Sequence, residues 1–319
     1  MRQTVLCLLC LWRFAIAADS QFNGSWDITV HDEKHPRAWW LKVEGAGTGS
    51  PKGEFVSAYA GDLNHIDEIS IQGNEIIFGF RPKPPAANAA SSGPGHLVYR
   101  ARLVGDKLEG TSEKAGQNRV PLTWTGVRAP AIPEQDDGSW QEGETIDLLN
   151  GRDLSGWHAL ESDRESKWSM SNAILTAPGQ GANLITNRKF WNFKLHVEYK
   201  IPPGSNSGIG LRARYEVQIR DDDGKTPGTH SNGALYSRIA PRINATKPAS
   251  QWQTYDIRLV GRQVTIILNG VNIIDKGMIE GLTAIASDPN EGEPGAIILQ
   301  GDHGPVEFRN IRLTPLAKK

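Results

Sequence analysis

The run from Asn206 to Arg220 carries polar side chains at alternate positions. In an extended strand, successive residues point to opposite faces, so one face would hold a polar row: Arg212, Arg214, Glu216, Gln218 and Arg220. The small residues Gly208 and Gly210 precede this row and would leave room for a ligand. Planar bidentate donors and a carboxylate suit hydroxyl-rich or oxyanionic ligands, although a solvated sheet face would show the same alternation.

Two histidines outside this run could contribute acid–base chemistry. His230 follows a loop and precedes Gly233-Ala234-Leu235-Tyr236, whereas His303 lies in Gln300-Gly301-Asp302-His303-Gly304. An imidazole titrates near neutral pH, but a single histidine is more often structural than catalytic, so both interpretations stay open. The sequence contains no G-x-S-x-G, H-E-x-x-H or P-loop motif.

The elements that would position these residues are strands. Residues 193–201 alternate apolar and polar side chains, and no segment shows a sustained helical period. Gly73-Asn74 and Asn269-Gly270 separate apolar runs in the way that β-hairpin turns do. We therefore predict an all-β protein.

The length of 319 residues favours two domains. Residues 22–128 contain short strands at regular spacing, which indicate a small β-barrel or sandwich. Residues 129–144 are Pro-containing and acidic, which is typical of a linker. Longer strands follow in residues 145–316 and predict a second β-domain.

Charge and the N-terminal residues bear on partners and location. The 35 Lys and Arg residues balance 36 Asp and Glu residues, which argues against a nucleic-acid partner. Residues 1–17 read as a secretory signal peptide ending in Ala15-Ile16-Ala17, and no stretch is long enough for a transmembrane segment. Both cysteines, Cys7 and Cys10, lie in that leader, so the mature chain would be secreted or periplasmic and without thiols.

Residues 143–316 resemble the 3-keto-disaccharide hydrolase family through several motifs in a fixed order. These are Leu148-Leu149-Asn150-Gly151-Arg152-Asp153-Leu154-Ser155-Gly156-Trp157, Asn206-Ser207-Gly208-Ile209, Glu216-Val217-Gln218-Ile219, Gly233-Ala234-Leu235-Tyr236, Asn269-Gly270, Gln300-Gly301-Asp302-His303-Gly304 and Phe308-Arg309-Asn310-Ile311-Arg312. One departure is Gly301, which is inserted where the family usually runs Leu-Gln-Asp-His-Gly. Residues 22–128 look like an accessory β-domain that often precedes the family.

The resemblance implies a concanavalin-like jelly roll acting on an oligosaccharide or glycoside oxidised at C3. A C3 ketone acidifies the C2 proton, and the resulting enolate can expel the group on C1, so the site needs a base, an enolate stabiliser and an acid. We expect Glu216 and His230 as base and acid, in either order, and Arg212 as the oxyanion stabiliser. A divalent metal held by Glu216 and a histidine such as His230 is a further expectation. The residues expected to bind substrate are Arg214, Gln218, Tyr236, Gln300, His303, Glu198 and Lys200.

Two other classes of function remain open. Jelly rolls also serve as lectins, so the domain could be a non-catalytic carbohydrate-binding module, and a third alternative is an adhesion or matrix domain. Exposed aromatic rings on a flat face would favour binding, whereas convergent titratable groups would favour catalysis.

Overall fold

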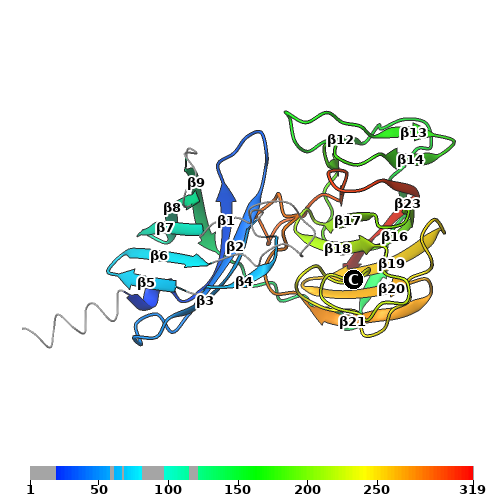
Figure 1. The fold of residues 1–319 in the computed structure, drawn as a ribbon. Helices are drawn as coiled ribbons and strands as arrows, with labels where there is room; N and C mark the ends of the chain where they lie inside the picture. Colours follow the sequence, from blue (N-terminus) through cyan, green and yellow to red (C-terminus); the bar gives the residue numbers. More distant parts are fainter. Residues whose placement is uncertain (1–18, 58–60, 67, 81–96, 115–120, 319) are drawn as a thin grey trace, which may run out of the picture. The chain divides into compact units, whose positions relative to one another are not determined.

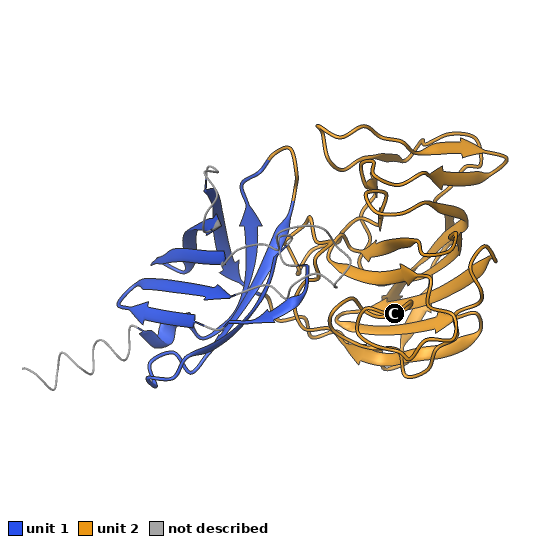
Figure 2. Cartoon of the chain, in the orientation of Figure 1, with its two compact units in different colours: residues 1–32, 37–129 blue, residues 33–36, 130–319 orange. Residues whose placement is uncertain are grey.

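The structure is a computed structural model that describes residues 19–57, 61–66, 68–80, 97–114 and 121–318. The chain divides into two compact units, coloured separately in Figure 2. The first contains residues 1–32 and 37–129, and the second contains residues 33–36 and 130–319. The expected signal peptide, residues 1–17, lies outside the described residues. None of the described residues forms a helix long and apolar enough to cross a bilayer.

The described part of the first unit is one curled antiparallel sheet preceded by a short 3₁₀-helix, η1 (Ser20–Phe22). Its strands run in the order β4-β3-β2-β1-β9-β8-β7-β6-β5 (Figure 1), so consecutive strands are neighbours except β4 and β5, which stand at the two ends of the order. Their bounds are β1 (Gly24–Val30), β2 (Ala38–Glu44), β3 (Lys52–Val56), β4 (Leu63–His65), β5 (Glu68–Gln72), β6 (Glu75–Phe80), β7 (Leu97–Val104), β8 (Lys107–Lys114) and β9 (Leu122–Arg128).

Aromatic side chains fill the core of this sheet. The ring of Phe55 lies 4.5 Å from Tyr99 and 5.1 Å from Phe78, and Trp39 contacts Tyr99 edge-on at 5.5 Å. Such pairs stabilise beyond the apolar area that they bury. Gly110 is needed because a Cβ there would lie 2.2 Å from the Trp124 ring. The first unit therefore has a core of its own.

The second unit is a β-sandwich of two antiparallel sheets, as the expected jelly-roll class requires. One sheet has the path β13-β14-β23-β16-β19-β20-β21, with β10 and β11 paired to β23, and the other runs β12-β15-β22-β17-β18 (Figure 1). The strands are β10 (Trp140–Glu142), β11 (Ile146–Asp147), β12 (Trp157–Ala159), β13 (Ser169–Ser171), β14 (Ile174–Ala177), β15 (Leu184–Thr186), β16 (Phe193–Lys200), β17 (Asn206–Leu211), β18 (Tyr215–Arg220), β19 (Gln253–Val260), β20 (Gln263–Leu268), β21 (Val271–Met278), β22 (Ile298–Leu299) and β23 (Val306–Lys318).

The predicted alternation and turns appear in these strands. In β16, the buried positions are Phe193, Leu195, Val197 and Tyr199, and the positions between them are less buried. The Asn269-Gly270 turn joins β20 to β21 with positive φ angles of 52° and 82°. A two-residue turn with both φ angles positive matches the twist of the strands it joins. Gly73-Asn74 also joins β5 to β6, with a positive φ of 63° at Gly73 and none at Asn74.

The expectation of one continuous strand from Asn206 to Arg220 is wrong, because the run is a hairpin. β17 pairs with β18, with Leu211 opposite Tyr215, and residues 212–214 form the turn. Arg212 and Ala213 both adopt positive φ, at 53° and 57°. A long side chain rarely takes this conformation unless its surroundings hold it there. The turn places Arg212 and Arg214 at the end of the sheet and not in line with Glu216.

Part of the segment predicted as a linker, residues 129–144, is built into the second unit. Trp140–Glu142 forms β10, whose partner is the end of β23. Both oxygens of Asp136 accept hydrogen bonds from Arg258, at 2.8 and 2.9 Å. The predicted limits of residues 22–128 and 145–316 remain predictions about independent folding.

Candidate functional site

Glu216 lies on a sheet face that is separate from the space between the two sheets. Its neighbours Val217 and Ile219 are fully buried on the other face of β18, where the hydroxyl of Tyr255 from the opposite sheet donates to the Gln218 carbonyl at 2.7 Å. On the Glu216 face, Ile298 pairs with Gly210 and belongs to a small apolar cluster of its own. Glu216 therefore projects from the five-stranded sheet away from the nine-stranded one.

The carboxyl of Glu216 is buried, with 4% of the residue exposed. It makes no hydrogen bond among the described residues, and burial raises its pKa to about 8. The charge of His303 lowers this pKa, and that of Asp302 raises it. Gly208 provides the space, because a Cβ there would lie 2.5 Å from Oε1 of Glu216. A buried carboxyl with a pKa near neutrality suits proton transfer.

Two glutamines on the same face have unused amide oxygens. Gln218 is opposite Gly208 in the ladder, and the backbone N–H of Gln300 donates to the Gly208 carbonyl. They are 2% and 8% exposed, and neither side-chain oxygen has a hydrogen-bond partner among the described residues. Buried polar atoms are normally paired, so these oxygens are available to hydroxyl groups of a ligand. Nearby, Oδ1 of Asn206 is also buried and unpaired in the described structure.

His303 and Asp302 form a hydrogen-bonded pair in the loop after β22. Nδ1 of His303 lies 2.6 Å from Oδ1 of Asp302, and Nη1 of Arg164 lies 3.5 Å from Oδ2 of Asp302. The hydrogen bond to Asp302 raises the pKa of His303, and the Glu216 charge raises it further. Electrostatic coupling thus joins His303 to Glu216.

The inserted Gly301 is accommodated in this loop. Its N–H donates to Oδ1 of Asn183 at 2.8 Å, and a Cβ at this position would lie 2.7 Å from the Ala182 carbonyl oxygen and from Nε1 of Trp168. The loop passes too close to its neighbours for a side chain, so glycine is the residue that fits.

His230 and Tyr236 lie beside the outer edge of β18. Their rings meet edge to face, with centroids 4.9 Å apart, and the backbone N–H of Tyr236 donates to the Glu216 carbonyl. Both side chains are half-buried. The structure thus places Gln218 and Gln300 on the face of Glu216 and couples His303 to it, whereas Tyr236 and His230 lie in the segment along the edge of β18.

Arg212 and Arg214, by contrast, are occupied by the protein itself. Both are fully buried. Arg212 donates to the carbonyls of Trp191 and Gly261 and to the side chain of Asn192, and burial lowers its pKa to about 10. Arg214 donates to the carbonyls of Asp288 and Glu293, and its Nη2 lies 2.9 Å from Oδ2 of Asp288. Both guanidinium groups anchor loops of the protein. The expected roles, oxyanion stabilisation for Arg212 and substrate binding for Arg214, do not fit this placement.

Glu198 and Lys200 are not at this face either, so the expectation that they share a groove with Glu216 is wrong, and a role for them in substrate binding stays a prediction. They belong to β16 in the nine-stranded sheet, on the opposite side of that strand from its buried residues. Glu198 accepts hydrogen bonds from Arg309 and Asn310, and Lys200 lies 2.7 Å from Glu307. The two sheets separate these residues from Glu216.

A metal site is not evident from the arrangement of ligands. Among the described residues, no group of three or more His, Cys, Asp or Glu side chains is placed to hold a metal ion. The expectation that Glu216 and His230 hold a divalent metal therefore stays a prediction.

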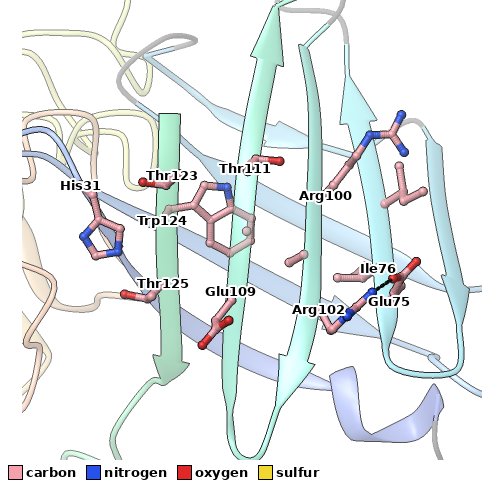
Figure 3. Close-up of a pocket in the computed structure, with 13 residues that line it drawn as sticks. His31, Glu75, Ile76, Arg100, Arg102, Glu109, Thr111, Thr123, Trp124 and Thr125 are labelled. Carbon is pink, nitrogen blue, oxygen red and sulfur yellow. Dashed lines mark hydrogen bonds and ion pairs between the residues drawn. The ribbon is translucent and has the colours of Figure 1, made fainter. Parts of the chain in front are cut away.

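The first unit has a shallow groove of about 520 Å³ across β6 to β9, shown in Figure 3. Its side chains are mostly charged or hydroxylated: Glu75, Arg100, Arg102, Glu109, Thr111, Thr123 and Thr125. Glu75 already pairs with Arg102 at 2.6 Å, and the carboxylates of Glu75 and Glu109 are both exposed. The groove therefore lacks the buried acid that distinguishes the Glu216 site.

Sequence reasoning missed Asp302 as a member of the site, along with Asn206. Asp302 directly precedes His303 in the sequence, and adjacent aspartate and histidine residues in a loop could have indicated a pair. No comparable signal indicated that Asn206 would be left without a partner.

Residues 144–314 match the sequence profile of the family described as the 3-keto-alpha-glucoside-1,2-lyase-like domain. A similar protein is the 3-keto-disaccharide hydrolase of Bacteroides thetaiotaomicron, which is 35% identical over 137 residues. That alignment covers 38% of this chain and 45% of the relative, so the similarity spans less than half of that protein.

Solved structures with some similarity include a candidate glycosyl hydrolase from Parabacteroides distasonis, at 25% identity and a TM-score of 0.47, covering 58% of this chain and 92% of the other. Another is the non-specific endo-beta-1,3(4)-glucanase SCLam of family GH16, at 12% identity and a TM-score of 0.37, covering 60% of this chain and 95% of the other.

Proposed function

The chain belongs to the family of 3-keto-alpha-glucoside-1,2-lyase-like domains, and from that membership we propose that it cleaves the glycosidic bond of 3-keto-glycosides. The reaction begins with removal of the proton on C2, which the neighbouring C3 ketone acidifies. The enolate then expels the group on C1, and addition of water to the resulting double bond completes a net hydrolysis.

The observation that carries this proposal is the buried, unpaired carboxyl of Glu216 with a pKa of about 8. A stronger base than an ordinary carboxylate is needed to remove a carbon-bound proton, and burial provides it. Glu216 is therefore the base. Ordinary glycosidases instead use two carboxylates flanking the bond.

The amide oxygens of Gln218 and Gln300 support binding of a sugar. They are acceptors in a buried setting, and the hydroxyl groups of a sugar ring are donors of the right kind. Leaving them unpaired costs free energy that a bound hydroxyl would recover. Tyr236, whose backbone N–H donates to the Glu216 carbonyl, carries a half-buried phenol and is a further candidate for binding a sugar hydroxyl.

The leaving oxygen needs a proton, and His303 and His230 are the two candidates for its donor. His303 is electrostatically coupled to Glu216, and His230 lies beyond the edge of β18 against Tyr236. With Arg212 occupied elsewhere, the enolate oxygen would be stabilised by donors other than that guanidinium, or by a metal if one binds.

The test is incubation of the purified protein with a 3-keto-glucoside and with the matching unoxidised glucoside. We expect release of the aglycone from the 3-keto substrate alone. Repeating the assay after dialysis against chelator, with and without added divalent ions, tests the metal expectation. Binding of glycans with no turnover of any 3-keto substrate would instead support a lectin-like module.

We further propose that the protein is exported and works in the periplasm or outside the cell, on the basis of the leader-like residues 1–17. Mass spectrometry of the N-terminus of the protein from its native cell should show a chain beginning after Ala17. An intact N-terminus in the cytoplasmic fraction would contradict this.

A further inference from the structure

The loop between β22 and β23 holds His303 in one fixed place. The backbone N–H groups of Gln300 and Gly304 donate to the carbonyls of Gly208 and Asn206 on β17. The hydroxyl of Ser207 donates to the Gln300 carbonyl at 2.8 Å, and the N–H of Gln180 donates to the carbonyl of His303. The backbone of His303 is therefore tied to the strand that pairs with β18.

The ring of His303 is oriented by its neighbour in the chain. A carboxylate accepts hydrogen bonds but does not donate them, so Nδ1 of His303 donates to Oδ1 of Asp302 across 2.6 Å. With Nδ1 occupied, Nε2 is the nitrogen left for a ligand. The side chain of His303 is 46% exposed, whereas that of Asp302 is 23% exposed and has Arg164 on its other oxygen.

We propose that Asp302 is a positioning residue that fixes the tautomer and orientation of His303, so that Nε2 of His303 donates the proton to the departing glycosidic oxygen. This inference rests on the proposed function, and it selects His303 over His230 as the acid. In the elimination, the C2 proton passes to Glu216, the C1–O bond breaks toward the aglycone, and His303 supplies the aglycone proton. In the hydration, water returns a proton to His303 as its oxygen bonds to C1, and Glu216 returns its proton to C2.

The pKa values of His303 and Glu216 both depend on the charge of Asp302. Asp302 and Glu216 favour the charged imidazolium, and Arg164 opposes it. Asp302 also raises the pKa of Glu216. Loss of the Asp302 charge would therefore lower the pKa values of both the base and the acid.

The decisive experiment compares two 3-keto-glucosides that differ in the leaving group, one releasing an alkyl alcohol and one releasing 4-nitrophenol. Nitrophenolate leaves without protonation, whereas an alkoxide does not. For Asp302→Asn, we expect kcat on the alkyl substrate to fall by about 10²-fold, within the range that positioned acid catalysis contributes. The loss on the nitrophenyl substrate should be less than about 10-fold on the same basis, and the pH optimum should move to lower pH.

His303→Gln provides a second variant whose folding is less at risk, because its side chain is exposed. It should show the same dependence on the leaving group, and adding Asp302→Asn to it should cost little more. Asp256→Asn is the matched control: it removes the carboxylate charge from an Asp–His pair in the other sheet, where Oδ1 of Asp256 lies 2.7 Å from Nδ1 of His196. It should leave the rates and the pH profile unchanged.

The outcomes separate the two proposals. Equal losses on both substrates, or an unmoved pH optimum in Asp302→Asn, would overturn the role of Asp302 while the proposed function stands. Failure of the wild-type protein to turn over either 3-keto-glucoside would overturn the proposed function, and this inference with it.

Discussion

Glu216, the proposed base, has the raised basicity that abstraction of a carbon-bound proton demands. Its carboxyl sits where the strand opposite has no side chain, and no protein donor stabilises its anion in the described structure. Hydrogen bonds to the anion would lower the basicity. The lack of hydrogen-bond donors to the Glu216 carboxylate in the described structure therefore keeps its pKa high.

Glu216→Gln keeps the shape of the side chain and removes the base. We expect kcat on a 3-keto-glucoside to fall by about 10²- to 10⁴-fold, with little change in substrate binding measured by calorimetry. For the wild type, kcat/KM should rise with pH as Glu216 loses its proton and fall at higher pH as His303 loses its own. A variant that keeps full activity would show that Glu216 is not the base.

The same substitution should change how stability depends on pH. The pKa of Glu216 is raised from 4.5 to about 8 in the folded protein, so the folded state binds the proton more tightly than the unfolded state. Wild-type stability therefore falls as pH rises from about 4.5 to 8, by about 1.4 kcal/mol per unit of pKa shift at most. Glu216→Gln should lack this loss, and urea unfolding at pH 5 and pH 8 would measure it.

Gln218→Met tests the use of the unpaired amide oxygens. Methionine has a similar length and removes a buried polar group that lacks a partner, so thermal stability should be unchanged or higher. Substrate binding loses one hydrogen bond, and KM should rise roughly 3- to 10-fold. A lower melting temperature with an unchanged KM would indicate that the amide serves the fold.

At the scale of elements, the β17–β18 hairpin determines which residues reach the site. Leu211 faces Tyr215 across a three-residue turn, so the odd-numbered residues before and after the turn stay on the same face. The grouping of Glu216 and Gln218 with Gly208 and Gly210 was therefore predictable from alternation, even though the strand was not continuous. The turn itself was not, because Arg212, Ala213 and Arg214 are not typical turn residues.

What holds that turn is tertiary structure, which a local pattern does not contain. The carbonyl of Arg212 lies where a Cβ on Gly295 would be, at 2.1 Å, and Thr283 donates to the Arg214 carbonyl. The buried partners of Arg212 come from residues 191, 192 and 261. The alternating pattern thus predicted the correct sheet face for Glu216 but the wrong environment for Arg212 and Arg214. Only long-range contacts distinguish the arginines from Glu216.

Arg212→Met distinguishes an anchoring arginine from a catalytic one. The variant removes the Arg212 donor from the carbonyls of Trp191 and Gly261, at about 1–3 kcal/mol each where no water replaces it, while Oδ1 of Asn192 keeps the N–H of Gly261. We expect a large loss of stability in urea unfolding, while the folded fraction keeps the wild-type pH profile and dependence on leaving group. A stable variant with strongly reduced kcat would restore Arg212 to the reaction.

At the scale of the whole molecule, residues before residue 145 form part of the second unit. β10 extends the sheet through the end of β23, and Asp136 holds Arg258 with two hydrogen bonds. We expect a protein comprising residues 130–319 to melt at a higher temperature than one comprising residues 145–319. Equal melting temperatures would indicate that residues 130–144 behave as a linker after all.

Gly208 has a consequence for how this protein could change by mutation. The smallest possible addition, the methyl group of alanine, would overlap the carboxyl of Glu216 and push it aside, while the backbone ladder could stay intact. The amides of Gln218 and Gln300, which we propose bind the sugar, would remain. A single substitution at position 208 could thus abolish catalysis while sugar binding is kept. Related proteins that bind sugars without cleaving them could arise by a change at this position.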